Sequence, residues 1–431
     1  MEEGRLEVGE PEWGPVRRIL FRFGFTYLFL YLLSTFLLLL AFIPYGESAV
    51  GWYFELWSVL VPWVARHLFQ ATALPHSTGS GDSLYRWMQV ACFATLAALV
   101  ALVWTLVDRK RKSYPRLYEG LRLYVRLGLG MTMIQYGAFK IVPSQFPQPS
   151  LDRLLQSIGD SSPMGILWTF MGASVPYTIF GGLTEWTGGA LLLFRRTMRL
   201  GALIGIAALT NVVMLNFCYD VPVKQFSAHL LAMAVFLAAP DLRRLADLLV
   251  LNRPVPPVAD RPLFRGRWPR LLGLALEALL LVGLTGYILN VSYQSYRSFH
   301  DAARHPLHGI WEVDELVLDG QVRPPVVTDA SRWRYVVFDY SDLFSILPMD
   351  NTRRRYVGTL DAGKKTIAVT KRDDPAWKSA LAYQQPAPGR LMVDGTFDGR
   401  KVHASLHRID PPKFLLGTRG FHWVSEYPFN R

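Results

Sequence analysis

Seven apolar stretches, each long enough to cross a lipid bilayer, constrain this sequence more than any other feature. A hydrocarbon core of about 30 Å needs about 20 helical residues, because an unpaired backbone amide in lipid costs several kcal/mol. The sequence therefore predicts a membrane α-helical bundle of about seven transmembrane helices. Their expected bounds are residues 19–43, 87–107, 122–141, 174–194, 200–219, 221–240 and 271–291.

Basic residues gather on alternate sides of successive stretches. The junctions on one side carry 18 Lys and Arg residues, whereas the short connections on the other side carry four. Positive charge is retained in the cytoplasm, so this bias places the N-terminus there and the C-terminus outside. The first stretch is longer than the apolar core of a signal peptide, so we expect it to remain as an anchor. The predicted location is a bacterial inner (plasma) membrane, with a periplasmic or extracellular C-terminal domain.

The composition changes along the chain and predicts four parts. They are two helices with an external interfacial helix and loop (1–107), a four-helix membrane core (108–245), a Pro-rich cytoplasmic linker with the seventh helix (246–300), and an external β domain (301–431). The interfacial helix is expected at 52–69, where Trp, Tyr and Leu alternate with few charges.

A second external connection at 143–172 is rich in proline. Ser150 stands directly before an apolar run, where it can cap a short helix. We expect this connection to lie over the outer mouth of the helical core.

The positive charge of the chain follows from its topology. Residues 301–431 hold 19 basic and 16 acidic side chains, so +9 of the net charge of +12 belongs to the membrane part. Cytoplasmic loops account for this excess, and anionic lipids are compatible partners. We predict membrane lipids as partners and no nucleic acid.

The two cysteines, Cys92 and Cys218, lie in predicted helices. They lack the CxxC spacing of a thioredoxin-like motif. A disulfide between them and two separate packing thiols both remain open.

Two helices carry polar and glycine stripes. At 100° per residue, each set occupies one face of its helix, where glycine lets another backbone come close. The stripes are Arg126, Gly130, Met133, Gly137 and Lys140 in the first helix, and Gly181, Gly182, Glu185, Gly188 and Gly189 in the second. Glu185 should therefore face protein rather than lipid.

Part of these stripes resembles the four-helix core of the DoxX family over about residues 122–245. The residues that carry the resemblance are Arg126, Gly130, Gly137, Lys140, Glu185, Gly188, Gly189, Leu191–Leu193, Arg199–Ala202 and His229. That family comprises small bacterial membrane proteins, some of which are linked to redox complexes that pass electrons to quinones or to the handling of thiol stress. The resemblance implies a helical bundle and a redox association. This chain departs from the family in its two preceding helices, its seventh helix and its external domain.

Carboxylates inside the membrane are candidate functional groups because ionised side chains are costly there. Glu185 lies near mid-membrane, either as a proton carrier or ligand contact, or as a packing group paired with Gln135 or Asn211 at similar depth. Lys140 lies about 15 Å higher by helix rise, so we do not expect it as the direct partner. Glu277 has no visible partner, which favours a snorkelling or packing role.

Polar residues also converge toward the outer surface. A quinone head group needs such donors and acceptors above an apolar shaft. The members are Lys140, Asn216, Cys218, Tyr219, Asp220, Lys224 and His229. Alternatively, Asp220 pairs with Lys224 across a tight turn and His229 bonds a backbone carbonyl. The spacing of Cys218, Asp220 and His229 matches no strong ligand signature, so we predict no metal.

Residues 301–431 change to short alternating runs bounded by Asp-Gly turns, which predicts an all-β antiparallel barrel. The runs are 311–318, 333–339, 343–347, 355–360, 366–370, 380–384, 390–393 with a continuation at 396–397, 402–407 and 421–425. Gly309 and Trp311 resemble the GxW start of lipocalin-like barrels, which implies that Arg431 covers the Trp and that the barrel holds an apolar ligand. A closed, filled barrel is the alternative. We expect the Arg353–Arg355 run to be a solvated strand end or a contact to lipid phosphates.

The sequence predicts an accessory component that binds a hydrophobic small molecule, with a quinone as candidate cofactor and a redox protein as candidate partner. The alternatives are a catalytic quinone-linked oxidoreductase subunit, with quinone near Glu185 and His229, and a transporter of lipid or small solutes. The β domain lacks a Ser-His-Asp triad, a phosphate loop, HExxH and CxxC, so hydrolytic or nucleotide chemistry has no support.

Overall fold

The computed structural model describes residues 12–430, apart from 43–44, 77, 257–265, 301–305, 341, 372, 375 and 410–413. The chain forms two compact units. The first consists of Met1–Ala138 and Gly181–Ile288, and the second of Phe139–Phe180 and Leu289–Arg431. The second unit is therefore assembled from two separate stretches of the chain.

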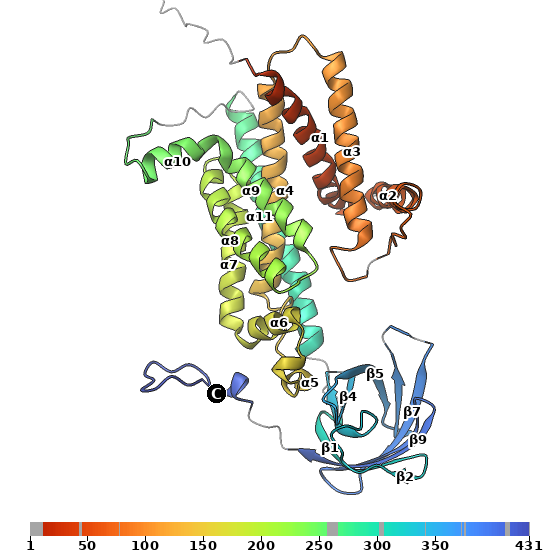
Figure 1. Ribbon diagram of the computed structural model, residues 1–431. Helices are drawn as coiled ribbons and strands as arrows, with labels where there is room; N and C mark the ends of the chain where they lie inside the picture. Colours follow the sequence, from red (N-terminus) through yellow and green to blue (C-terminus); the bar gives the residue numbers. More distant parts are fainter. Residues whose placement is uncertain are drawn as a thin grey trace, which may run out of the picture. The chain divides into compact units, whose positions relative to one another are not determined.

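The first unit is a helical bundle (Figure 1). Apolar sequence and few internal breakers make its helices long, and helices α4, α7 and α11 continue into the second unit. The helices are α1 (Pro15–Leu37), η1 (Leu38–Phe42), α2 (Gly46–Phe69), α3 (Leu84–Val107), α4 (Pro115–Ile141), α7 (Val175–Leu193), α8 (Met198–Cys218), α9 (Lys224–Ala238), η3 (Ala239–Asp241), α10 (Leu242–Leu249) and α11 (Arg267–His300).

The chain is a membrane protein by the length and composition of its helices. Among the described residues, five helices can cross a membrane: Pro15–Leu40, Leu84–Val107, Met198–Cys218, Lys224–Leu249 and Arg267–Ser298. A sixth is added if α6 (Pro163–Ala173) and α7, which meet at 98°, form one broken span. The predicted number of seven exceeds this count.

When the bent pair is counted, the remaining difference is α4, which covers the predicted span at 122–141. Arg126 and Lys140 make this helix less apolar than the others, yet both side chains are buried in the protein. Leu129 and Ile134 on the same helix have no exposed surface. A helix enclosed by protein can carry polar side chains that a lipid-facing helix cannot. Apolar composition alone therefore does not identify α4 as a candidate span.

The two glycine stripes, at which the sequence predicts a close backbone, bring α4 and α7 together. A Cβ atom on Gly137 would lie 2.6 Å from the backbone nitrogen of Trp186, and one on Gly189 would lie 2.7 Å from the carbonyl oxygen of Gly130. No side chain fits at such distances, so both positions require glycine. Gly181, at the other end of the stripe, has no neighbour within 4 Å.

Helix α2 confirms the helix expected at 52–69. Tyr53 and Trp57 are buried against α1 and α3, whereas Trp52 and Trp63 are exposed. Figure 1 shows α2 end-on beside the lengthwise α1 and α3. Its orientation and its aromatic outer face are typical of a helix in a membrane interface.

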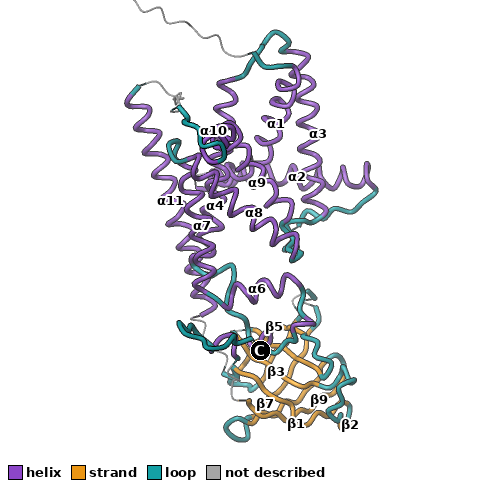
Figure 2. The backbone as a smooth tube through the Cα atoms, turned by 60° about the vertical axis from the view of Figure 1, so that its left-hand side comes forward, coloured by secondary structure: helices purple, strands orange, loops and turns teal. Residues whose placement is uncertain are grey.

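The second unit contains a closed antiparallel β-barrel of eight strands, with short β2 added beside β1 (Figure 2). The order along the sheet is β2-β1-β3-β4-β5-β6-β7-β8-β9, and pairing of β1 with β9 closes it. The strands are β1 (Gly309–Leu318), β2 (Gln321–Val322), β3 (Trp333–Asp339), β4 (Leu343–Pro348), β5 (Arg354–Asp361), β6 (Thr366–Thr370), β7 (Lys378–Gln384), β8 (Arg390–Phe397) and β9 (Arg400–Ile409).

Turn chemistry explains most of the strand boundaries. Asp319 and Gly320 both have positive φ (51° and 80°), as the expected Asp-Gly hairpin requires. The Asp-Gly pair that contains Gly395 is no turn, because this glycine lies inside β8, where a Cβ would come 2.5 Å from the carbonyl oxygen of Ala380. The strand predicted at 421–425 is wrong: β9 already pairs on both sides, so the closed barrel offers no edge for another strand.

Large apolar side chains fill much of the barrel interior. Trp311 is buried and donates its indole N–H to the carbonyl of Leu307 at 2.8 Å. Arg332 is also buried and donates to the carbonyls of Val313 (2.8 Å) and Asp314 (3.2 Å), where the β1 register shifts. The predicted cover for Trp311, Arg431, lies outside the described residues.

The stretch between α4 and α7 folds with the barrel as part of the second unit. It contains α5 (Leu151–Leu154), η2 (Ile158–Asp160) and α6 (Pro163–Ala173). Leu151 and Leu155 pack against the outer faces of β1 and β3. Ser150 precedes a short helix as predicted, but its hydroxyl makes no capping bond and donates instead to the carboxylate of Asp152.

Candidate functional site

A tyrosine–histidine cluster lies between α1 and α9. The hydroxyl of Tyr27 is 2.6 Å from Nε2 of His229, and Nδ1 of His229 is 2.6 Å from the carbonyl oxygen of Gln225. The ring of Tyr31 stacks on the imidazole with 4.2 Å between centroids. Tyr27 and Tyr31 are four residues apart and therefore share one face of α1.

The hydrogen bonds determine the state of His229. A backbone carbonyl only accepts, so Nδ1 must carry the proton that bonds Gln225. In the neutral ring Nε2 is then the acceptor, and Tyr27 donates to it. The cluster thus presents one hydroxyl donor and one imidazole acceptor side by side.

Asp82 positions the helix that carries His229. Its carboxylate accepts from the backbone nitrogens of Lys224 (2.7 Å) and Gln225 (3.1 Å), which are unsatisfied donors in the first turn of α9. The nitrogen of Gly81 donates to Pro222 at 2.7 Å. The loop before α3 therefore holds the N-terminal end of α9.

Glu185 is buried and faces the protein, as predicted. It interacts electrostatically with Tyr136 of α4. Its proposed partners Gln135 and Asn211 are both exposed on the outside of their helices, so the expectation that either pairs with Glu185 inside the bundle is wrong. Successive residues of a helix point about 100° apart, so Gln135 points outward although its neighbour Ile134 is buried.

Asp220 and Lys224 form the ion pair of the simpler alternative, and His229 bonds a backbone carbonyl as that alternative expects. Lys224 pairs with Asp220 at 2.6 Å, and Asp220 is exposed. Asn216 is buried and donates to the hydroxyl of Ser227 at 3.0 Å, while Lys140 is buried near the end of α4. Cys92 and Cys218 are both free thiols. Across the described residues, no cluster of three His, Cys, Asp or Glu side chains has metal-binding geometry.

Glu277 has a partner, contrary to expectation. Arg126 of α4 donates a hydrogen bond to its carboxylate, and the guanidinium is almost fully buried. The ion pair lets two charged residues share the bundle interior. The two side chains come from positions 151 residues apart, and no local pattern joins them.

A cavity of about 360 Å³ lies at the end of the barrel where β1 ends and β3 begins. Trp333, Tyr356 and Phe397 line it with edge-to-face contacts of 5.2 Å between centroids. Burial raises the pKa of Tyr356, so its phenol stays neutral. Arg354 and Arg400 stand at the rim. The barrel interior is thus filled at its centre and hollow at one end, where an aromatic floor meets a basic rim.

A buried carboxylate attaches α5 to the barrel. Asp152 has no exposed surface and accepts two hydrogen bonds from Arg355, at 2.7 and 3.0 Å. Arg353 lies 3.7 Å away and Ser345 donates at 3.3 Å. Burial alone would raise the pKa of Asp152, but the hydrogen bonds and charge of Arg355 outweigh it and lower the pKa below its ordinary value. Arg355 is exposed at the start of β5, as expected for a solvated strand end, and in addition it pairs with Asp152; Arg353 is partly buried beside the same carboxylate.

The fold and these sites define a helical membrane protein that carries a closed antiparallel β-barrel. Within that class, the chain belongs to the family of the uncharacterized protein YwoB of Bacillus subtilis, with 34% identity over 136 residues. The matched region covers 31% of this chain and 80% of YwoB. No family model matches the chain, and no solved structure matches it.

Proposed function

We propose that this protein is a DoxX-like inner-membrane component that holds a hydrophobic small molecule, with a quinone as the leading candidate, in support of a membrane redox or envelope-stress process. The observation that carries the proposal is the hydrogen bond between Tyr27 and His229 beside the stacked ring of Tyr31. A quinone carbonyl needs a donor and a quinol hydroxyl needs an acceptor. When the hydrogen bond between Tyr27 and His229 opens, the hydroxyl of Tyr27 is the donor for the quinone carbonyl, and Nε2 of His229 is the acceptor for the quinol hydroxyl.

The surroundings of the cluster support an apolar ligand. Its helices α1 and α9 belong to two candidate membrane spans, so a molecule dissolved in the bilayer reaches them without crossing water. The neutral imidazole and the two phenols carry no charge, so an apolar ring can bind beside them without the cost of removing water from a charged group. An accessory role fits these groups. They supply hydrogen bonds to the quinone, and a redox partner protein supplies the electrons.

The proposed topology has seven spans, with α4 and the bent α6–α7 pair added to the five apolar helices. The N-terminus is then cytoplasmic and the barrel is periplasmic. The bias of basic residues supports this orientation.

The test is native mass spectrometry and lipid extraction of the full-length protein in mild detergent. We expect one quinone per protein chain, reduced at least about tenfold in Tyr27→Phe and His229→Ala, because each loses one hydrogen-bond partner. Gln135→Ala, an exposed position on α4, is the matched control and should keep the quinone. A wild-type protein that carries only bulk phospholipid would overturn the proposal.

The barrel cavity favours a second candidate, in which the apolar molecule binds outside the membrane and the protein passes lipid or a small solute between bilayer and exterior. A volume of about 360 Å³ and an aromatic floor suit a small apolar ligand. The same extraction separates the two sites. A ligand retained in His229→Ala but lost in Phe397→Ala belongs to the barrel.

A further inference from the structure

The segment after β9 exposes a run of large apolar side chains. Residues 414–430 contain one helical turn, α12 (Leu415–Thr418), and otherwise no helix or strand. Trp423 is 91% exposed and Tyr427 is 84% exposed. The exposed large apolar side chains are Leu415, Leu416, Phe421, Trp423, Val424, Tyr427 and Phe429. Contiguous exposed apolar surface of this kind marks a site of contact with another apolar phase.

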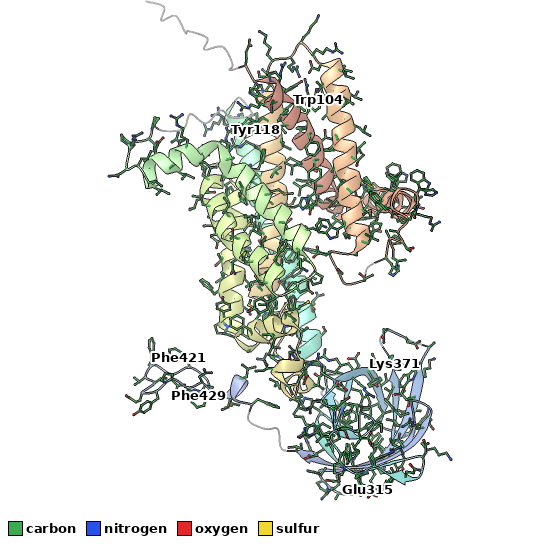
Figure 3. All side chains as sticks on the ribbon, in the orientation of Figure 1. Trp104, Tyr118, Glu315, Lys371, Phe421 and Phe429 are labelled. Carbon is green, nitrogen blue, oxygen red and sulfur yellow. The ribbon has the colours of Figure 1, made fainter. Side chains whose placement is uncertain are left out.

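The segment adds no strand to the barrel sheet. Its strands β1 and β9 pair with each other, so the sheet is complete before residue 414. The segment makes its own short-range contacts, in which Arg419 stacks on the ring of Phe429 at 4.3 Å and donates to His422 at 3.0 Å. Figure 3 shows Phe421 and Phe429 on this strand-free segment.

The first residue of the segment lies near the start of β1, the strand that follows α11 in the chain. Phe414, its first residue, packs in the cluster that contains Ile310, near the start of β1. The candidate span in α11 ends at Ser298. The eleven residues from there to β1 reach at most about 40 Å, and the 17 residues of the segment reach about 55 Å when extended. The bilayer surface is therefore within reach of the segment.

Its composition selects the bilayer interface. Trp and Tyr prefer the head-group region, where the ring is buried and the polar atom stays wet. Trp423 and Tyr427 stand beside Phe421 and Val424, while Arg419 supplies a cation for lipid phosphates. The apolar side chains are spread along irregular backbone, which suits a soft interface better than a shaped protein groove.

We propose that residues 414–430 lie in the outer head-group region of the bilayer that the helices span, and tether the barrel to the membrane at a second point besides α11. This tether is independent of any ligand in the bundle or barrel.

Spin-label accessibility in the full-length protein tests the tether. Cys92→Ala and Cys218→Ser give a cysteine-free background, and Tyr427→Cys or Trp423→Cys carries the nitroxide. The protein is reconstituted in vesicles of phosphatidylethanolamine and phosphatidylglycerol. Oxygen concentrates in lipid and a nickel chelate stays in water, so their collision rates report the phase around the label. Glu315→Cys, an exposed position on the barrel (Figure 3), is the aqueous control.

We expect the ratio of oxygen to nickel collisions at 427 and 423 to exceed that at 315 about threefold or more, because aromatic segments of this kind insert about 5–10 Å into the interface. Equal ratios at the three positions would overturn the proposal, since the segment would then be in water. Low collision rates with both reagents would also overturn it, because the segment would then be covered by protein.

Discussion

Replacement of Asp152 by asparagine removes the charge that holds α5 on the barrel while preserving the size of the side chain. Asp152 is fully buried, and Arg355 and Arg353 both lie within ion-pair distance of it. Asparagine keeps one acceptor oxygen for Arg355 but leaves two guanidinium groups without a counter-charge. We expect the α5 segment to detach more often, while the barrel itself stays folded.

The magnitude follows from how far the pair is buried. Loss of one partner from a fully buried ion pair costs about 3–5 kcal/mol, whereas an exposed pair contributes about 0.2–1 kcal/mol. The side chain of Arg355 is 46% exposed and can regain water, so the cost of losing Asp152 lies between these two free-energy ranges. We expect a loss of about 2 kcal/mol, which is about a 30-fold change in the docking equilibrium.

Hydrogen–deuterium exchange of the full-length protein in nanodiscs measures this change. Peptides that cover 150–156 should exchange about 30-fold faster in Asp152→Asn, because exchange there requires local detachment. Asp160→Asn, an exposed acid in the same stretch, should leave the rate unchanged. An unchanged rate in Asp152→Asn would refute the reasoning, and an equal acceleration throughout the barrel would show unfolding rather than detachment.

Three further predictions concern acidity and helix packing. The folded-state pKa of Asp152 is depressed, so its contribution to docking is complete above the ordinary Asp pKa of about 3.9 and is lost as the pH falls through the folded-state pKa; the protection factor of the same peptide, which is the intrinsic exchange rate at each pH divided by the measured rate, should fall below about pH 4 and stay constant from pH 5 to 7. Gly137→Ala should lower the melting temperature by separating α4 from α7, whereas Gly181→Ala, with open space around it, should not; equal melting would contradict the close packing. Glu277→Gln should destabilise the bundle by about 3 kcal/mol, and an additional Arg126→Met should restore part of the loss; a double variant as unstable as the single one would argue against the ion pair.

Features that repeat at short spacing could be predicted from the sequence. The stripe that contains Gly137 predicted a face for close packing because glycine spacing encodes a helix face, but it did not name α7 as the partner. Asp319-Gly320 predicted a hairpin because few residue pairs tolerate two positive φ values. The closed barrel follows from the alternation of its strands, whereas the depth-based pairing of Glu185 with Gln135 or Asn211 failed because depth does not specify direction around a helix.

Contacts between distant parts of the chain could not be predicted. Tyr27 and His229 are 202 residues apart, and Asp152 and Arg355 are 203 residues apart. The sequence neighbours of these residues suggest simpler roles: Tyr27 is one of several aromatic residues in an apolar stretch, and Arg355 belongs to a run of three arginines. Only the folded topology brings these groups within hydrogen-bond distance.

The discontinuous second unit also has a consequence for synthesis. A ribosome adds about 5–20 residues per second, so the 203 residues between Asp152 and Arg355 take about 10–40 s to appear. Throughout that interval α5 has been made and its binding surface on the barrel has not. Leu151 and Leu155 have no barrel surface to pack on until β1 and β3 have been made, and Asp152 keeps its water until β5 leaves the ribosome. The contact between Asp152 and Arg355 therefore forms late in synthesis, although its first half is among the earlier parts of the chain to be made.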